Sequence, residues 1–184
     1  IYLTRMHSSG IVILPYHRII RFKKERTLAQ LLAGLDNVVT IEKYPYEDDN
    51  SPKKVERAIS ASTKPSFALY SGNDPSNFYV LTEKVPLYTD PSVPETLRKL
   101  KVSILHAGIL KNLLNIEDEE ISFTQDLYPS IEQVKEGTVD LAVFLPPTLV
   151  KEVKEVAEHG LYMPPKSTFF YPKILTGLVF HKYG

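Results

Sequence analysis

The sequence contains no cysteine, which excludes disulfide bonds, cysteine nucleophiles and thiolate metal sites. It also lacks an apolar run of about 18 residues, the shortest stretch that reads as a membrane-spanning helix. The N-terminal residues lack the basic and apolar regions of a secretory signal peptide. These absences predict a cytoplasmic protein without a membrane partner.

An excess of charge is absent as well, because 22 Lys and Arg residues balance 22 Asp and Glu residues. Nucleic-acid binding rests on a basic surface, so a nucleic-acid partner is not indicated. The 184 residues are 43% hydrophobic, enough for one domain that buries roughly 70% of its unfolded surface. The chain begins at Ile1 with strand-like residues and no initiator methionine, which predicts a fragment of a longer protein.

Several site signatures are missing from the sequence. It has no H-E-x-x-H or H-x₃₋₅-H spacing for zinc, no G-x-S-x-G elbow and no G-x-G-x-x-G dinucleotide motif. The acidic run 47–49 has the carboxylates that a divalent cation needs, but its setting is more typical of a solvated turn. We therefore assign no metal site and no cofactor.

The first half has the alternating apolar patterns and turn residues of short strands and hairpins. The strongest hairpin signal is Gly72–Pro75 between two apolar runs. The expected elements are strands over 1–6, 11–14, 37–44, 66–70 and 78–81, a helix over 26–35 capped by Thr27, and a helix from about 51 to 62 in which Ser51 is the cap and Pro52 the first-turn residue.

The second half alternates helices and strands, which is typical of βαβ units with partly parallel strands. The expected elements are helices over 102–114, 130–135 and 148–158 and strands over 121–124, 139–145 and 177–180. We predict an α/β fold (or α+β) in which helices flank a mixed sheet, with a hairpin-rich first half and a βαβ-like second half. Residues 1–184 form one domain, or two lobes, 1–83 and 96–184, joined by the proline-rich connector 84–95.

The segment 163–173 holds three prolines, two lysines, three aromatic residues and two aliphatic hydroxyls. Prolines fix φ, so we expect a rigid loop. Phosphate recognition needs an ammonium group, hydroxyls and free backbone amides, which this loop supplies. The predicted ligand-binding residues are Lys166, Ser167, Thr168, Tyr171 and Lys173. The alternative is a connection whose aromatic residues plug the edge of the core.

A second candidate segment, 15–18, follows the apolar strand 11–14, where α/β proteins often place ligand sites. Arg18 is a candidate for neutralising ligand oxygens, and His17 is a catalytic candidate for moving a proton. The alternative is that Arg18 simply begins a surface segment and His17 caps it. His106, beside a predicted core stripe, is more typical of a packed histidine. We expect the early and late segments to meet at one cavity.

Three segments together, 13–18, 105–106 and 163–179, resemble the C-terminal half of the bacterial and archaeal family designated domain of unknown function 1015. The resemblance spans nearly the whole chain, and the late loop is its most specific part. The residues that match the family pattern are Pro15, His17, Arg18, His106, Lys166, Ser167, Thr168, Tyr171 and Lys173.

The resemblance implies a missing N-terminal half that ends in an Asp-Gly-His-His-Arg motif, which this chain lacks. That motif is similar to one in ParB-like proteins, whose relatives include nucleotide-dependent enzymes and a free-serine kinase. The resemblance therefore implies that part of an enzymatic site lies outside this chain.

Three functions stay open at this point. The first is part of an enzyme that binds a phosphate-bearing small molecule or a nucleotide, with kinase-like phosphoryl transfer as its reaction. The second is a ligand-binding or regulatory module without chemistry. The third is a structural interaction lobe whose aromatic loop packs on the missing N-terminal half or on a second subunit in a homo-oligomer.

Overall fold

A computed structural model describes residues 11–173, so the strands expected over 1–6 and 177–180 lie outside the described residues. The elements are β1 (Val12–Leu14), β2 (His17–Ile20), α1 (Leu28–Ala33), β3 (Val39–Pro45), α2 (Ser51–Ala61), β4 (Ser66–Ser71), β5 (Asn77–Glu83), α3 (Glu95–Arg98), α4 (Lys101–Ser103), the π-helix η1 (Ile104–Leu113), the 3₁₀-helix η2 (Asp118–Glu120), β6 (Ile121–Thr124), α5 (Leu127–Lys135), β7 (Leu141–Phe144), α6 (Val150–Glu158) and β8 (Phe169–Tyr171).

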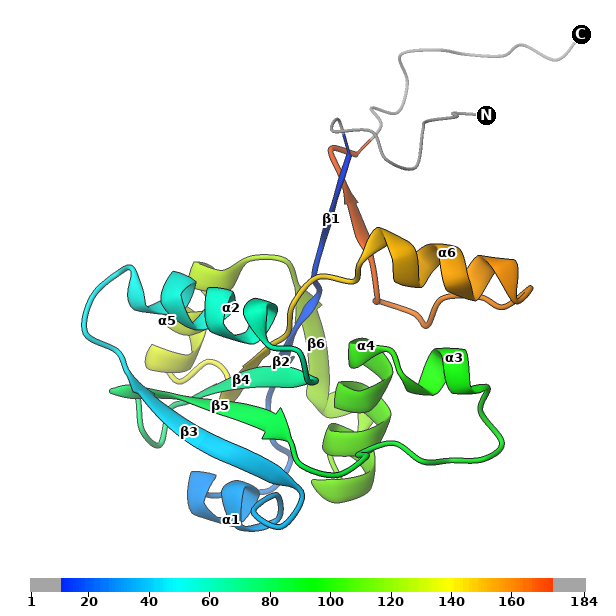
Figure 1. Ribbon diagram of the computed structural model, residues 1–184. Helices are drawn as coiled ribbons and strands as arrows, with labels where there is room; N and C mark the ends of the chain where they lie inside the picture. The colour runs from blue at the N-terminus through cyan, green and yellow to red at the C-terminus, as the bar shows by residue number, and fades with distance from the viewer. Residues whose placement is uncertain (1–10, 174–184) are drawn as a thin grey trace, which may run out of the picture.

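Six strands form a sheet in the order β3-β5-β4-β7-β2-β6, and β1 pairs with β8 in a separate two-stranded ribbon that projects from the body (Figure 1). Every strand pair in the described chain is antiparallel. Since β6 and β7 both run antiparallel to β2, they run parallel to each other with β2 between them. In the same way, β3 and β4 flank β5. Each pair forms a split βαβ unit, with α5 or α2 as the connecting helix.

The predicted α/β class, with helices flanking a sheet, is confirmed, and the second half is βαβ-like. Its parallel strands, β6 and β7, do not pair with each other, because β2 from the first half lies between them. The expectation of a loop at 15–18 was wrong in part. His17 and Arg18 begin β2, and all four residues of this strand are buried.

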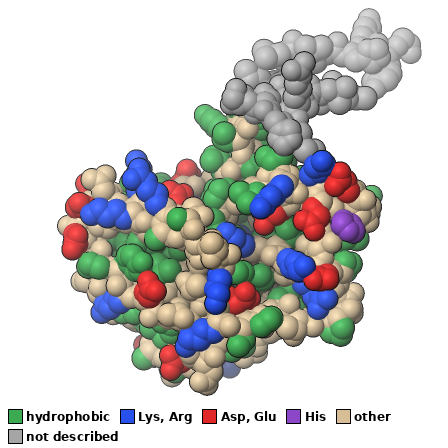
Figure 2. Space-filling view, viewed as in Figure 1, with side chains coloured by type: hydrophobic (Ala, Val, Ile, Leu, Met, Phe, Trp, Pro, Cys, Tyr) green, Lys and Arg blue, Asp and Glu red, His purple; other side chains and the backbone are tan. Residues whose placement is uncertain are grey.

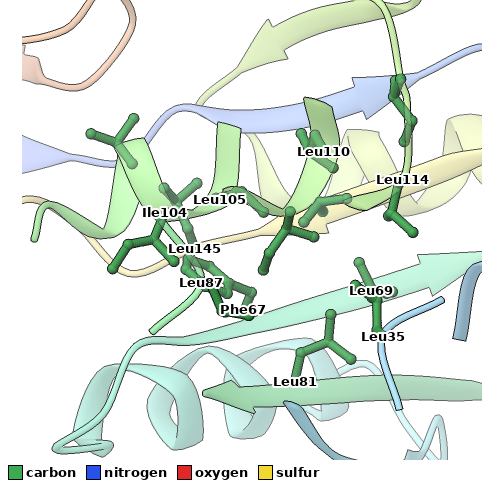
Figure 3. Packing of buried hydrophobic residues seen from close by; sticks show 14 of the residues in the cluster. Leu35, Phe67, Leu69, Leu81, Leu87, Ile104, Leu105, Leu110, Leu114 and Leu145 are labelled. Carbon is green, nitrogen blue, oxygen red and sulfur yellow. The ribbon is translucent and has the colours of Figure 1, made fainter. Parts of the chain in front are cut away.

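Both faces of the sheet are covered. On one face, Val55 of α2 and Ile131 of α5 pack against strand residues such as Tyr70. On the other face, leucines from η1 meet Phe67 and Leu69 of β4 (Figure 3). Burial of apolar area on both faces, at about 25 cal/mol per Å², stabilises the three layers.

The signals that begin and end helices are mostly confirmed. Thr27 caps α1, because its hydroxyl accepts from the Gln30 amide while the Gln30 side chain accepts from the Thr27 amide. Gly160 follows α6 with φ +66°, a conformation that favours glycine. At α2 the cap is Asn50 rather than Ser51, because the Ser51 hydroxyl accepts from amides of the preceding acidic loop.

The helix predicted over 102–114 is present, but from Ile104 to Leu113 it is a π-helix. Gly108 lies where this helix meets the connector, and a Cβ at this position would be 2.6 Å from the Leu87 carbonyl oxygen. Residues 84–94 contain no helix or strand, yet Leu87 is buried in the core. No helix in the described part of the chain is long and apolar enough to cross a membrane.

Candidate functional site

A cavity of about 650 Å³ lies between β2, β6, η1 and the loop that follows α6. This volume is in the usual range for small-molecule sites. The polar and charged residues that line it are Arg18, Ser103, His106, Asp118 and Lys166. The remaining lining residues are aliphatic or aromatic.

Arg18 is only 1% exposed, although it carries a guanidinium group. Its Nη1 donates to the Tyr16 carbonyl oxygen, its Nη2 lies 3.5 Å from the Lys166 carbonyl oxygen, and its Nε has no partner. The guanidinium lies 5.2 Å from the centre of the Phe123 ring, a cation–π distance.

No carboxylate in the described residues forms an ion pair with Arg18. Burial removes the guanidinium group from water and lowers the pKa of Arg18 to about 10. Residues 1–10 and 174–184 contain no aspartate or glutamate. Since a pKa of about 10 leaves the group protonated at neutral pH, Arg18 is a buried cation without an acidic partner among residues 11–173. Such a group is destabilising unless an anion offsets its charge.

Lys166 lines the same cavity from the late loop, with its backbone in the left-handed region at φ +54°. Backbone strain of this kind in a non-glycine residue is frequent at ligand sites. The Lys166 ammonium group lies 5.3 Å from the centre of the Tyr16 ring. The structure therefore brings the early and late segments together, with Arg18 and Lys166 at one cavity.

His106 enters the cavity from η1, and its Nε2 lies 3.2 Å from an oxygen of Asp118. The other oxygen of Asp118 accepts from Lys111 at 2.6 Å, and this bond lowers the pKa of Asp118. Burial and the charge of Arg18 lower the pKa of His106, while Asp118 acts in the opposite direction. Helix periodicity gave no sign of this arrangement, because Asp118 meets His106 only in the tertiary structure.

His17 lies on the opposite face of β2 and does not line the cavity. The His17 ring meets the Phe144 ring edge-on, with 5.1 Å between the two ring centres, and the residue is 1% exposed. Burial, and then the charge of Arg18, lower the pKa of His17 to about 4. Neighbouring strand residues point to opposite faces, so β2 separates the His-Arg pair that the sequence suggested would act together.

Four other predicted ligand residues of the late loop do not line the cavity. Ser167 is buried and its hydroxyl has no partner, whereas Thr168 is half-buried. Tyr171 is exposed in β8. Lys173 is also exposed, and its ammonium group lies 4.2 Å from the ring centre of Phe169. The predicted cradle therefore contributes only Lys166 to this cavity.

On the face shown in Figure 2, basic and acidic side chains are interspersed, without a large area of one charge. The β1–β8 ribbon exposes apolar side chains, with Val12 47%, Phe170 43% and Tyr171 53% exposed. The structural-lobe hypothesis expects Phe169, Phe170 and Tyr171 to be exposed as one patch; Phe170 and Tyr171 are exposed, whereas Phe169 is half-buried.

No family model matches the sequence, and no curated protein matches it. Among solved structures, a conserved hypothetical protein from Pyrococcus furiosus has a TM-score of 0.50 at 15% identity, over 91% of this chain and 59% of that chain. A free serine kinase in complex with AMP has a TM-score of 0.49 at 17% identity, over 91% of this chain and 56% of that chain.

The similarity to the Pyrococcus protein concerns the fold alone, and this chain spans less than two thirds of the length of either protein. Membership of the domain of unknown function 1015 family stays a prediction. Cytoplasmic localisation and the oligomeric state also stay predictions.

Proposed function

We propose that the cavity binds the phosphate group of a small molecule, a class that includes nucleotides, through Arg18 and Lys166. The observation that carries this proposal is the burial of Arg18 without an acidic partner in the described part of the chain. A bound phosphate offsets this charge, and guanidinium groups match phosphate oxygens through paired hydrogen bonds.

Phosphoryl transfer from such a ligand is the reaction that we propose for an enzyme built on this site. In that reaction the acceptor hydroxyl loses its proton to a base as its oxygen bonds to phosphorus, while the bond between phosphorus and the ester or anhydride oxygen of the donor breaks and that oxygen leaves with the remainder of the donor. His106, held by Asp118, lines the cavity and is better placed for this task than His17. A binding module without chemistry is the second candidate, favoured by the burial of His17 away from the cavity.

The first prediction concerns Arg18→Gln. We expect inorganic phosphate, pyrophosphate and AMP to raise the melting temperature of the wild type, because ligands that bind the native state stabilise it. Loss of charged hydrogen bonds, at about 1.5–3 kcal/mol each, should weaken binding by about 10- to 100-fold. Isothermal titration calorimetry measures this change.

Arg57→Gln is the matched control, since Arg57 is exposed on α2, on the other face of the sheet, and we expect it to bind phosphate like the wild type. Equal phosphate affinity in the wild type and in Arg18→Gln would contradict the proposal. Incubation with ADP and with ATP, followed by phosphorus NMR, separates the two candidates. Stabilisation without turnover favours the binding module.

A further inference from the structure

Two polar side chains of the cavity, Arg18 and His106, lie near Phe123, which also lines it. The Phe123 ring centre lies 5.2 Å from the Arg18 guanidinium and 6.5 Å from the centre of the His106 ring. Asp118 bonds to His106, and the Lys166 carbonyl oxygen lies 3.5 Å from Arg18 Nη2. These contacts define a head-group end of the cavity.

The remainder of the lining is mainly apolar, and its hydroxyl groups belong to Ser103, Tyr88 and Tyr162. Leu97 of α3 and Met163 of the late loop line it, and both pack against the main hydrophobic core. Ala107 adds a small side chain from η1. A ligand body with many polar groups would find few side-chain partners here for the hydrogen bonds to water that it loses, which is unfavourable.

Tyr162 completes the apolar part of the cavity at its rim. It is 91% exposed although it lines the cavity. A ligand with an apolar body would remove part of this ring from water, and the same contact would favour binding through the hydrophobic effect.

We infer that the ligand of this cavity is an amphipathic phosphate ester, with its phosphate at the Arg18 end and a hydrocarbon body along the apolar walls. This inference rests on the proposed function and narrows it. Within the class of phosphate-bearing small molecules, it favours an ester with an apolar or aromatic body over a sugar phosphate or a nucleotide, whose hydroxyl groups and ring heteroatoms need polar partners.

The test compares ligands that carry the same head group. Phenyl phosphate, glycerol phosphate and AMP are all phosphate monoesters, and calorimetric titration of the full chain gives their affinities. We expect phenyl phosphate to bind at least about tenfold more tightly than glycerol phosphate, because its ring becomes buried. We also expect it to bind more tightly than AMP. Equal or tighter binding of glycerol phosphate or AMP would overturn the inference.

Ala107→Leu adds apolar volume inside the cavity and leaves Arg18 and Lys166 unchanged. We expect this variant to bind phenyl phosphate about tenfold or more weakly, because the larger side chain occupies the space of the ligand's ring. Inorganic phosphate has no ring, so its affinity should stay the same. Ala157→Leu, an identical change at an exposed position of α6, should leave both affinities unchanged. An unchanged affinity of Ala107→Leu for phenyl phosphate would contradict the inference.

Val93→Ser is a second variant that tests the same wall by removing apolar surface from the connector. We expect the affinity for phenyl phosphate to fall several-fold, whereas the affinity for inorganic phosphate stays the same. An unchanged affinity for phenyl phosphate would contradict the inference.

The two proposals fail in different ways. Arg18-dependent binding of all phosphates without preference for phenyl phosphate defeats only the inference. Absence of Arg18-dependent binding of any phosphate defeats both.

Discussion

At the residue scale, β2 places two basic side chains in opposite environments. Arg18 and Ile20 face η1, whereas His17 and Ile19 face α2 and α5. Arg18 therefore keeps its charge next to the cavity. His17 stays neutral inside the core, because burial and Arg18 lower its pKa to about 4 from 6.5.

The pH dependence of stability follows from His17. Its folded pKa is depressed, so the unfolded state takes up the proton first and stability falls as the pH drops from about 6.5 to about 4. The full loss is about 3 kcal/mol, at 1.36 kcal/mol per pKa unit. His17→Phe should reduce the slope of unfolding free energy against pH, as measured by urea denaturation at several pH values.

His159→Phe is the control for this measurement, since His159 is exposed after α6. It should keep the slope of the wild type. An equally steep slope in His17→Phe would show that other groups cause the acid sensitivity.

At the element scale, η1 carries His106 to the cavity and packs against the connector. Gly108 makes this packing close, because a Cβ there would lie 2.6 Å from the Leu87 carbonyl oxygen. Leu87 and Tyr88 precede the short helix α3, and Tyr88 lines the cavity. The distance between η1 and the connector therefore helps to set the width of the site.

Gly108→Ala should destabilise the protein by about 2 kcal/mol, since an added methyl in a packed region forces the backbone to shift. Gly34→Ala is the comparison, because its Cβ would meet the nearest atom at an ordinary 3.5 Å and its φ is −67°. We expect that variant to be at least as stable as the wild type. Urea denaturation measures both, and equal stability of the two variants would contradict the close contact.

At the scale of the whole molecule, the two predicted lobes share one sheet. β4 of the first lobe pairs with β7 of the second, and β2 lies between β7 and β6. The larger core cluster also contains residues from both halves, such as Leu69 and Leu105. Neither half has a complete sheet or a complete core without the other.

We therefore expect the chain to unfold as one cooperative unit. Tyrosine fluorescence and far-ultraviolet circular dichroism should give coincident urea transitions, and the separate fragments 1–83 and 96–184 should not fold. Two separated transitions, or a folded isolated fragment, would support two independent lobes instead.

The sequence by itself determined the local features of this protein. The Thr27 cap and the hairpin of β4 and β5 depend on residues close together in the chain. Their signals are therefore complete within a short window. The sequence also identified Arg18 and Lys166 as candidate ligand residues, and the structure places both at the cavity.

Only the tertiary structure decided the arrangement of strands and of the site. Strand pairing joins distant segments, so no local pattern places β2 between β7 and β6. That placement turns His17 away from the cavity and buries Arg18 beside Phe123. The contact between His106 and Asp118 likewise depends on how η1 and η2 pack against each other. No sequence pattern reports that packing, because it is set by the tertiary structure.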